Sequence, residues 1–246
     1  MPASSATPVT SAESQSPFSF LASHGLRSPL SAIRWACGRL RKTSTGDLNK
    51  EQRELVEEIH ANAKTLTTVL GSMQLLGKLE DRTYKIKHEE VALANLLLSL
   101  THGLEHARAV EWKVSCPADM HVNVDGPVLE SILVNLLTVC MESCAEPRAV
   151  SIDVTQDNGD TLIHLFAALE LPFLYASAAE DKREVSRLVG GIPGLMLCLS
   201  SAMAQFLHGG VALHEATLVE RKHHAAAAGK AEDVKLYRIS LGLKKR

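Results

Sequence analysis

One histidine in this chain is placed for chemistry of its own. His24 lies in a stretch with helical spacing, Pro29 follows five residues later, and a heptad pattern of apolar residues begins beside it. A neutral imidazole nitrogen is a nucleophile that can take up a phosphoryl group and pass it on. A lone histidine on a helix is also a common solvated surface residue. The rest of the chain has to decide between these two interpretations.

The composition predicts a folded protein that binds neither nucleic acid nor membrane. Of the 246 residues 46% are hydrophobic but 4% aromatic, so Leu and Ala supply most of the burial and helix is favoured over strand. The formal net charge of -2 leaves no basic surface for nucleic acid. The five cysteines show no CxxC spacing, which indicates core packing rather than metal or disulfide chemistry and fits a cytoplasmic location.

Two segments need a separate check for targeting and for membrane insertion. Residues 1–16 are rich in Ser, Thr, Ala and Pro and lack the apolar centre of a signal peptide, so they predict a disordered tail. The uncharged stretch 188–213 is long enough to span a bilayer, but glycine pairs and polar residues interrupt it. A buried core helix from Gly194 to about Leu207 is the better interpretation.

Residues 17–82 predict two long helices joined by a short turn. The first begins at Pro17; the second runs from about Lys50 to about Leu79, with Asp47 or Asn49 as its N-cap. Apolar residues spaced by four and three form a seam along each helix. They are Leu26, Leu30, Ile33, Cys37 and Leu40 on the first helix, and Leu55, Ile59, Leu66, Val69, Met73 and Leu76 on the second.

This helical hairpin predicts a homodimer. Two helices of this length cannot bury both seams alone, whereas a second copy would complete a four-helix bundle. The polar Asn62 occupies one seam position, where such a residue can fix the register.

A second unit is expected at residues 88–246, after a charged linker that covers Glu80 to Glu90 and ends in a short edge strand. Its pattern mixes helix and strand and predicts one mixed sheet with helices on one face, in the α+β class. Asp125 is an expected N-cap, and Asp157-Asn-Gly159-Asp an expected hairpin turn. The predicted helices cover 91–108, the stretch after Asp125, and 194–207; the predicted strands cover 110–114, 120–124, 149–154, 161–166, 211–214 and 236–241.

The chain resembles the core of two-component histidine kinases. The family pattern S-H-E-L-R-T-P-L-x-x-I corresponds to the run from Ser23 to Ile33, in which His24 falls on the phospho-accepting histidine. The resemblance implies a dimerisation and histidine-phosphotransfer hairpin followed by an α/β sandwich of the histidine-kinase ATPase type. Ser28 falls on the position that can orient a water for dephosphorylation, and Arg27 on the face expected to dock a receiver domain.

The resemblance is incomplete beside the histidine and at the nucleotide site. Kinases carry Glu or Asp after the histidine, where it orients the imidazole, and this chain has Gly25. In the N-L-L-x-N-A motif Asn135 is kept, but Val139 replaces the Asn that contributes to Mg²⁺. The D-x-G-x-G motif, expected around His164 to Pro172, is missing.

The last glycine motif survives in part. The family's G-x-G-L-G-L corresponds to a stretch that keeps its middle glycine at Gly194, preceded by Gly190 and Gly191. The family's helix-ending H-G-G is kept as His208-Gly209-Gly210. We therefore interpret Asn135, Gly190, Gly191 and Gly194 as a vestigial nucleotide site within a retained fold; the family's two flanking motif glycines correspond to Ile192 and Met196.

Three functions follow from these observations. The leading hypothesis is a histidine phosphotransferase, resembling the bundle-type phosphotransferases with a degenerate second domain, in which His24 relays phosphoryl groups to and from receiver-domain aspartates. Its partners would be a second copy, receiver domains and an upstream hybrid kinase, with no cofactor. The alternatives are a divergent active sensor kinase, which would need ATP and Mg²⁺, and a regulator that docks a receiver or kinase without carrying phosphate.

No metal site is predicted. The adjacent His223 and His224 open a long connection that runs on to Lys230, and a solvated loop is the expected structure. A metal site there is disfavoured because the two histidines have no third ligand at a suitable spacing in the sequence.

Overall fold

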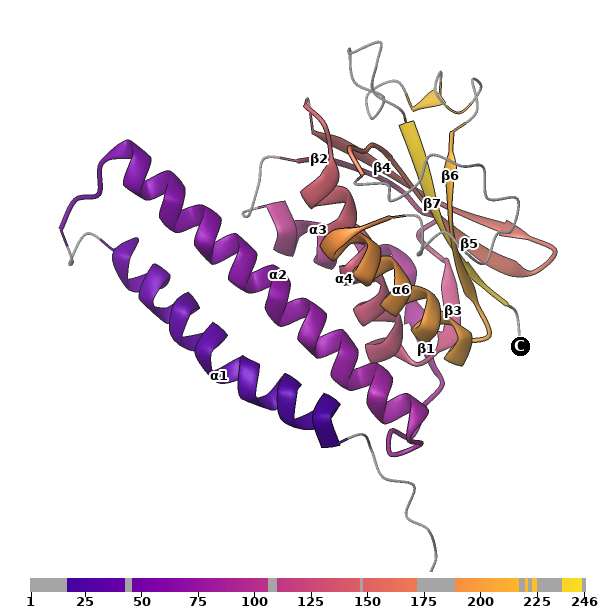
Figure 1. The fold of residues 1–246 in the computed structure, drawn as a ribbon. Helices are drawn as coiled ribbons and strands as arrows, with labels where there is room; N and C mark the ends of the chain where they lie inside the picture. Colours follow the sequence, from indigo (N-terminus) through magenta and orange to yellow (C-terminus); the bar gives the residue numbers. More distant parts are fainter. Residues whose placement is uncertain are drawn as a thin grey trace, which may run out of the picture.

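The computed structural model describes residues 17–42, 46–105, 110–146, 148–171, 189–216, 220, 223–224 and 236–244, with residues 17–25 described by their backbone. The predicted tail at 1–16 and most of the predicted connection at 223–230 lie outside these residues. The described part is a helical hairpin packed against a unit of helices and strands (Figure 1).

The hairpin consists of α1 (Pro17–Leu40) and α2 (Lys50–Glu80), which lie antiparallel along their length (Figure 1). Asn49 is the N-cap of α2: its side chain accepts a hydrogen bond from the backbone N–H of Gln52, and the Gln52 side chain accepts one in return from the N–H of Asn49. This capping box satisfies two backbone donors that a helix start otherwise leaves open. The predicted α2 N-cap is therefore Asn49 rather than Asp47.

The second unit contains two sheets rather than the single predicted one. A five-stranded sheet has the order β2-β4-β5-β7-β6, with β2 and β4 parallel and the other neighbours antiparallel. A separate pair joins β1 and β3. The elements are β1 (Glu89–Ala92), α3 (Leu93–Glu105), β2 (Glu111–Ser115), β3 (His121–Val124), α4 (Gly126–Ser143), β4 (Ala149–Asp157), β5 (Asp160–Ala168), α6 (Gly191–Phe206), β6 (Gly210–Glu215) and β7 (Leu236–Leu243).

The beginning of the predicted helix at 91–108 is wrong. Val91 and Ala92 belong to β1, where they pair with Val122 and His121 of β3, and α3 starts at Leu93. The pairing explains the difference, because β3 offers a partner for backbone groups that a sequence window of helical character cannot reveal.

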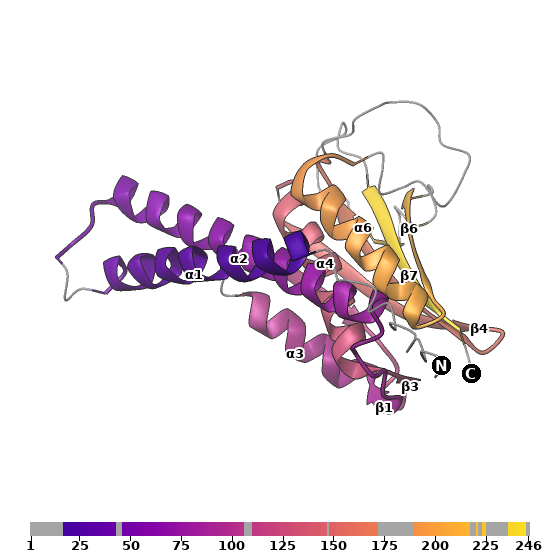
Figure 2. The same ribbon diagram turned by 60° about the horizontal axis from the view of Figure 1, so that its bottom comes forward.

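Helices α4 and α6 cover one face of the five-stranded sheet (Figures 1 and 2). Alternate residues of the strands, such as Ile152, Ile163 and Ile239, point into the apolar core beneath these helices. Their neighbours, including Asp153 and Phe166, therefore lie on the opposite face. By length and composition α4 could cross a membrane, but 67% of it is buried inside the protein, as is usual for a core helix.

The hairpin and the second unit share part of their packing. Val69 and Leu79 of α2 belong to the same apolar core as α4 and α6. Ser72 of α2 lies 3.3 Å from Ser131 of α4 through their Oγ atoms. Helix α2 thus serves both the hairpin and the second unit.

Candidate functional site

The predicted phospho-acceptor lies on α1, upstream of a proline that interrupts the hydrogen bonding of that helix. His24 is in the second turn of α1, and its side chain is outside the described residues. Pro29 lies inside the same helix and has no N–H to donate to the carbonyl of Gly25. The helix next to His24 is therefore held by fewer backbone hydrogen bonds than a regular helix.

Arg27 and Ser28 are exposed one turn beyond His24. Arg27 extends toward α2: its Nη2 atom lies 4.0 Å from the point that a Cβ on Gly71 would occupy. A Cβ at Gly71 would be in ordinary van der Waals contact with the Arg27 guanidinium. The surface near His24 thus combines a cation and a hydroxyl from α1 with a small residue of α2.

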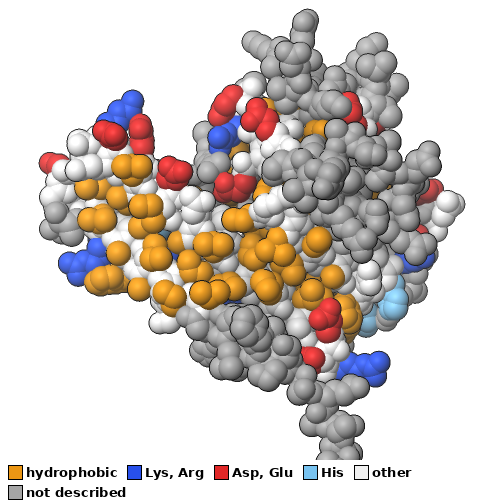
Figure 3. Space-filling model, in the orientation of Figure 1, with side chains coloured by type: hydrophobic (Ala, Val, Ile, Leu, Met, Phe, Trp, Pro, Cys, Tyr) orange, Lys and Arg blue, Asp and Glu red, His pale blue; other side chains and the backbone are white. Residues whose placement is uncertain are grey.

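Along the hairpin, most of the predicted seam is exposed in the single chain. Leu26, Ile33 and Leu40 of α1 are 41–51% exposed, and Figure 3 shows hydrophobic side chains in a band along the hairpin. Cys37 and Val69 are buried, whereas Asn62 is exposed. We call the exposed part of this seam the apolar stripe; it consists of Leu26, Ile33, Leu40, Leu55, Ile59, Leu66 and Met73.

Asn135, the motif residue predicted to remain from a nucleotide site, lies beneath α2. Asn135 is fully buried, and its Oδ1 accepts a hydrogen bond from Ser72 Oγ at 3.0 Å. Its Nδ2 has no hydrogen-bond partner among the described residues. Val139, at the position of the family's second Asn, is fully buried in the apolar core.

Gly190, Gly191 and Gly194 are needed for the backbone conformation and packing at the start of α6. Gly190 is the N-cap of α6 and Gly191 has a positive φ of 65°. A Cβ on Gly194 would lie 1.8 Å from the carbonyl oxygen of Val189, which no side chain can tolerate. Gly194 is therefore required by close packing of the backbone, and this requirement does not depend on nucleotide binding.

The expected D-x-G-x-G region is a strand end instead of a nucleotide loop. His164 and Phe166 lie within β5, and Leu169 forms an isolated bridge with Cys144. The predicted turn is confirmed between β4 and β5, where Asn158 and Gly159 both have positive φ.

These residues do not fit Mg²⁺-ATP in this arrangement. Mg²⁺ requires oxygen ligands, and Val139 supplies none. Asn135 is the remaining motif amide, and it already accepts a hydrogen bond from α2 in a buried position.

Sequence reasoning missed the contact that anchors the linker. The Asp125 carboxylate caps α4 as predicted, and it also accepts hydrogen bonds from the Tyr84 hydroxyl at 2.9 Å and the Lys87 N–H at 2.8 Å. Burial and the hydrogen bond to Asp125 raise the pKa of Tyr84 to about 12. A capping Asp gives a sequence signal, but its long-range partners do not.

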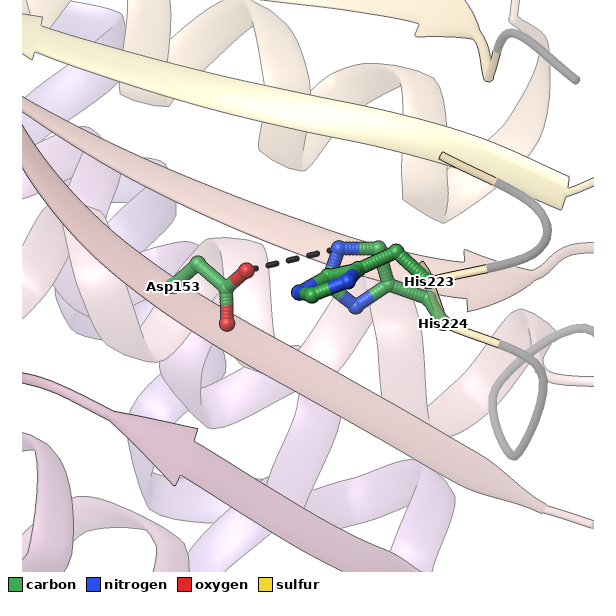
Figure 4. A group of neighbouring side chains, drawn as sticks. All are labelled: Asp153, His223 and His224. Carbon is green, nitrogen blue, oxygen red and sulfur yellow. Dashed lines mark ion pairs between the residues drawn. The ribbon is translucent and has the colours of Figure 1, made fainter. Parts of the chain in front are cut away.

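Sequence reasoning also missed a cluster on the outer face of the sheet. Asp153 of β4 approaches His223 and His224, and one ligand atom of each residue lies within 4.8 Å of the others (Figure 4). The sequence has no third ligand at a suitable spacing from the two histidines, but folding brings Asp153 to them from 70 positions before His223.

Comparison with known proteins gives a family match for the hairpin and sequence relatives that cover most of the chain. Residues 21–82 match the family of the His Kinase A (phospho-acceptor) domain. The chain is 24% identical over 198 residues to "Sensor protein KdpD" of Clostridium acetobutylicum, a match covering 76% of this chain and 22% of that protein. It is 26% identical over 218 residues to "Histidine protein kinase DivJ" of Caulobacter vibrioides, covering 80% of this chain and 34% of that one. The chain thus spans about a third or less of the length of these two relatives.

Two solved structures share the fold. One is full-length ShkA in complex with AMPPNP, with a TM-score of 0.55 and 16% identity over 92% of this chain and 45% of that chain. The other is the Acinetobacter baumannii histidine kinase AdeS, with a TM-score of 0.53 and 12% identity over 90% of this chain and 97% of that chain. The resemblance to a two-component histidine kinase core and the predicted fold class are confirmed.

Proposed function

We propose that this chain, which has the core architecture of a two-component histidine kinase, is a histidine phosphotransferase. His24 takes a phosphoryl group from the aspartyl phosphate of one receiver domain and passes it to the aspartate of another. Autophosphorylation from ATP is lost. The observation that carries this proposal is the state of the nucleotide site, in which Asn135 is buried under α2 and Val139 belongs to the apolar core.

The chemistry asks little of this chain. A neutral imidazole nitrogen attacks phosphorus, the P–O bond to the receiver aspartate breaks, and the aspartate leaves as a carboxylate. Phosphoryl transfer depends chiefly on positioning and on neutralising charge, which the Mg²⁺ of the receiver supplies. The chain has to present an accessible histidine. The absence of an acidic residue at position 25, which would orient the imidazole, matters less because the receiver supplies Mg²⁺ for the transfer.

Receivers would dock on the part of the hairpin around His24. Arg27 provides a cation for the acidic, phosphate-bearing face of a receiver, and Ser28 provides a hydroxyl that can position a water for dephosphorylation. The Arg27 guanidinium lies beside Gly71 of α2. These roles of Arg27 and Ser28 are part of the proposal.

The working form would be a homodimer in the cytoplasm. The apolar stripe supports this, since large exposed apolar surfaces on soluble proteins mark interaction sites. Burying it against a second hairpin would complete the four-helix bundle and leave the two His24 residues outside the seam. We retain the division into a hairpin at 17–82 and a vestigial ATPase-like unit at 88–246, with a hybrid kinase as an upstream donor.

A divergent sensor kinase is the second candidate. It is favoured by the relatives, whose names describe a sensor protein and a histidine protein kinase. In that case α2 would have to move away from α4 to open the nucleotide site, and ATP and Mg²⁺ would be required.

One labelling experiment separates the candidates. The purified chain is incubated with labelled ATP and Mg²⁺, and in parallel with receiver domains carrying a labelled aspartyl phosphate. We expect label from receivers alone, lost in His24→Ala and kept in the matched variant His102→Ala, which removes an exposed histidine of α3.

Each outcome assigns a function. Label from ATP that depends on His24 would establish the sensor kinase and refute the phosphotransferase. A chain that takes label from neither donor but binds receivers would be a docking regulator. Label that persists in His24→Ala would show that the phospho-acceptor is a different residue.

A further inference from the structure

Three potential metal ligands meet on the face of the sheet that α4 and α6 leave uncovered. Asp153 projects from β4, and His224 Nε2 lies 3.3 Å from its Oδ2 (Figure 4). The His223 ring lies edge-on to that of His224, with 4.9 Å between ring centroids. All three ligand atoms lie within 4.8 Å of one another, and tetrahedral Zn²⁺ holds its ligands about 3.3 Å apart.

The short segment that carries the histidines is fixed to the sheet by contacts outside the cluster. The His224 ring stacks on Phe166 of β5, with centroids 3.8 Å apart and planes at 14°. Glu220 pairs with Arg238 of β7, and its carbonyl accepts a hydrogen bond from the backbone N–H of His224. His224 is therefore oriented before any ion arrives, as ligands in preorganised sites are.

The chemical state of the groups suits a cation. A neutral imidazole has a lone pair that a metal ion can accept, and burial, the largest cause, lowers the pKa of His224. Asp153 supplies the negative charge, while Lys113 is the cation that faces the cluster from β2. His223 is exposed, which leaves a coordination position for water or another ligand.

We propose that Asp153, His223 and His224 form a binding site for a divalent transition-metal ion, with Zn²⁺ as the best match. Two imidazoles and a carboxylate are a ligand set that Zn²⁺ accepts, whereas Mg²⁺ and Ca²⁺ prefer oxygen throughout. The ion joins residues 223–224 to β4, which lies between β2 and β5 in the sheet. The bound ion fixes His223 and His224 to the outer face of the sheet.

The site is separate from the proposed phosphotransfer chemistry. His24, Arg27 and Ser28 belong to the hairpin, which packs on the side of α4 and α6. Asp153 and Phe166 point to the opposite side of the sheet. Metal binding and phosphotransfer can therefore be tested independently of each other.

The test is direct binding of Zn²⁺ to the full chain after treatment with a chelator. Isothermal titration calorimetry gives stoichiometry and affinity, and Co²⁺ in place of Zn²⁺ gives a visible absorption that reports coordination by nitrogen and oxygen. We expect one ion per chain. His223→Ala and Asp153→Asn each weaken binding by at least about tenfold, the loss that even an outer-shell contact commonly causes.

Two matched variants complete the design. His102→Ala removes an exposed histidine elsewhere, and His24→Ala removes the proposed phospho-acceptor; both are expected to bind Zn²⁺ like the unaltered chain. His223→Ala changes an exposed side chain, and circular dichroism confirms that it folds. The proposal is overturned if the unaltered chain binds no Zn²⁺, or if His223→Ala and Asp153→Asn bind it as tightly as the unaltered chain does.

Discussion

At the scale of single residues, two positions decide what the second unit can do. Val139 is fully buried, and its side chain completes the apolar core where the family has an amide. Asn135 keeps its amide, but Ser72 occupies its oxygen and its nitrogen stays unpaired among the described residues. Both positions of the motif thus contribute to packing in this structure.

Restoring the missing amide is expected to destabilise the protein without restoring nucleotide binding. Val139→Asn places a polar group in an apolar core, which costs about 1–3 kcal/mol of unfolding free energy. Urea denaturation measures that loss, and fluorescent ATP analogues measure binding. Val139→Thr serves as the control, because it keeps the shape of valine and adds one hydroxyl instead of an amide. Nucleotide binding by Val139→Asn would contradict the prediction and show that α2 leaves the site open in solution.

Tyr84 is expected to be a residue on which stability depends. Tyr84→Phe removes the hydrogen bond to the buried Asp125 carboxylate, and hydrogen bonds to charged groups contribute about 1.5–3 kcal/mol. Chemical denaturation of Tyr84→Phe, Asp125→Asn and the double variant isolates the pairwise part of this loss. Additive losses from the two single variants would show that the pair does not interact.

Tyr84 also makes the free energy of unfolding depend on pH in the alkaline range. Tyr84 has a pKa of about 12 in the folded chain and about 10 when unfolded. Between these values the unfolded state gives up its proton first, so rising pH favours unfolding. The contribution of Tyr84 is complete below pH 10 and is lost as the pH rises through 12. The difference in stability between the unaltered chain and Tyr84→Phe should shrink over that range.

At the scale of elements, α2 carries three different tasks along one helix. Its start is fixed by the Asn49 capping box, one side contributes to the apolar stripe, and another side packs through Val69 and Leu79 into the core of the second unit. A helix engaged on several sides needs defined ends, because a shift of one residue rotates its faces by about 100°.

The cap of α2 is expected to have a measurable contribution to stability. Asn49→Ala removes the acceptor for the Gln52 N–H and should cost about 1 kcal/mol, the usual effect of losing an N-cap. The adjacent Lys50→Ala alters a side chain that is 92% exposed and should be nearly neutral. Thermal unfolding of the two variants makes the comparison, and equal stability would mean that the cap is dispensable.

Sequence patterns predicted the helices, strands and turns better than they predicted the contacts between distant parts of the chain. The heptad spacing, the capping Asp125 and the Asn158-Gly159 turn each depend on neighbours in sequence, and the structure has the corresponding helices and hairpin. The separate β1–β3 pair and the cover of α2 over Asn135 depend on long-range contacts, which leave no periodic signal. The Asp153–His223–His224 cluster went unnoticed for the same reason.

At the scale of the whole molecule, the apolar stripe predicts how copies associate. Ile59→Glu places a charge in the middle of the stripe, where Ile59 is 50% exposed, and should convert a dimer into monomers. Leu98→Glu alters a 48% exposed leucine of α3 outside the stripe and should leave the dimer intact. Light scattering after gel filtration gives both masses; a monomeric unaltered chain would refute the dimer.

The order of the parts along the chain adds a consequence for how the protein is made. The hairpin with its apolar stripe precedes the sheet in the sequence, so a ribosome releases α1 and α2 while the rest is still being translated. At about 5–20 residues per second, synthesis of residues 81–246 alone takes roughly 10–30 s. We expect hairpins on neighbouring ribosomes of one messenger RNA to pair during that interval. Partner choice would then be settled during synthesis, in favour of identical chains and before related kinases in the cell can compete.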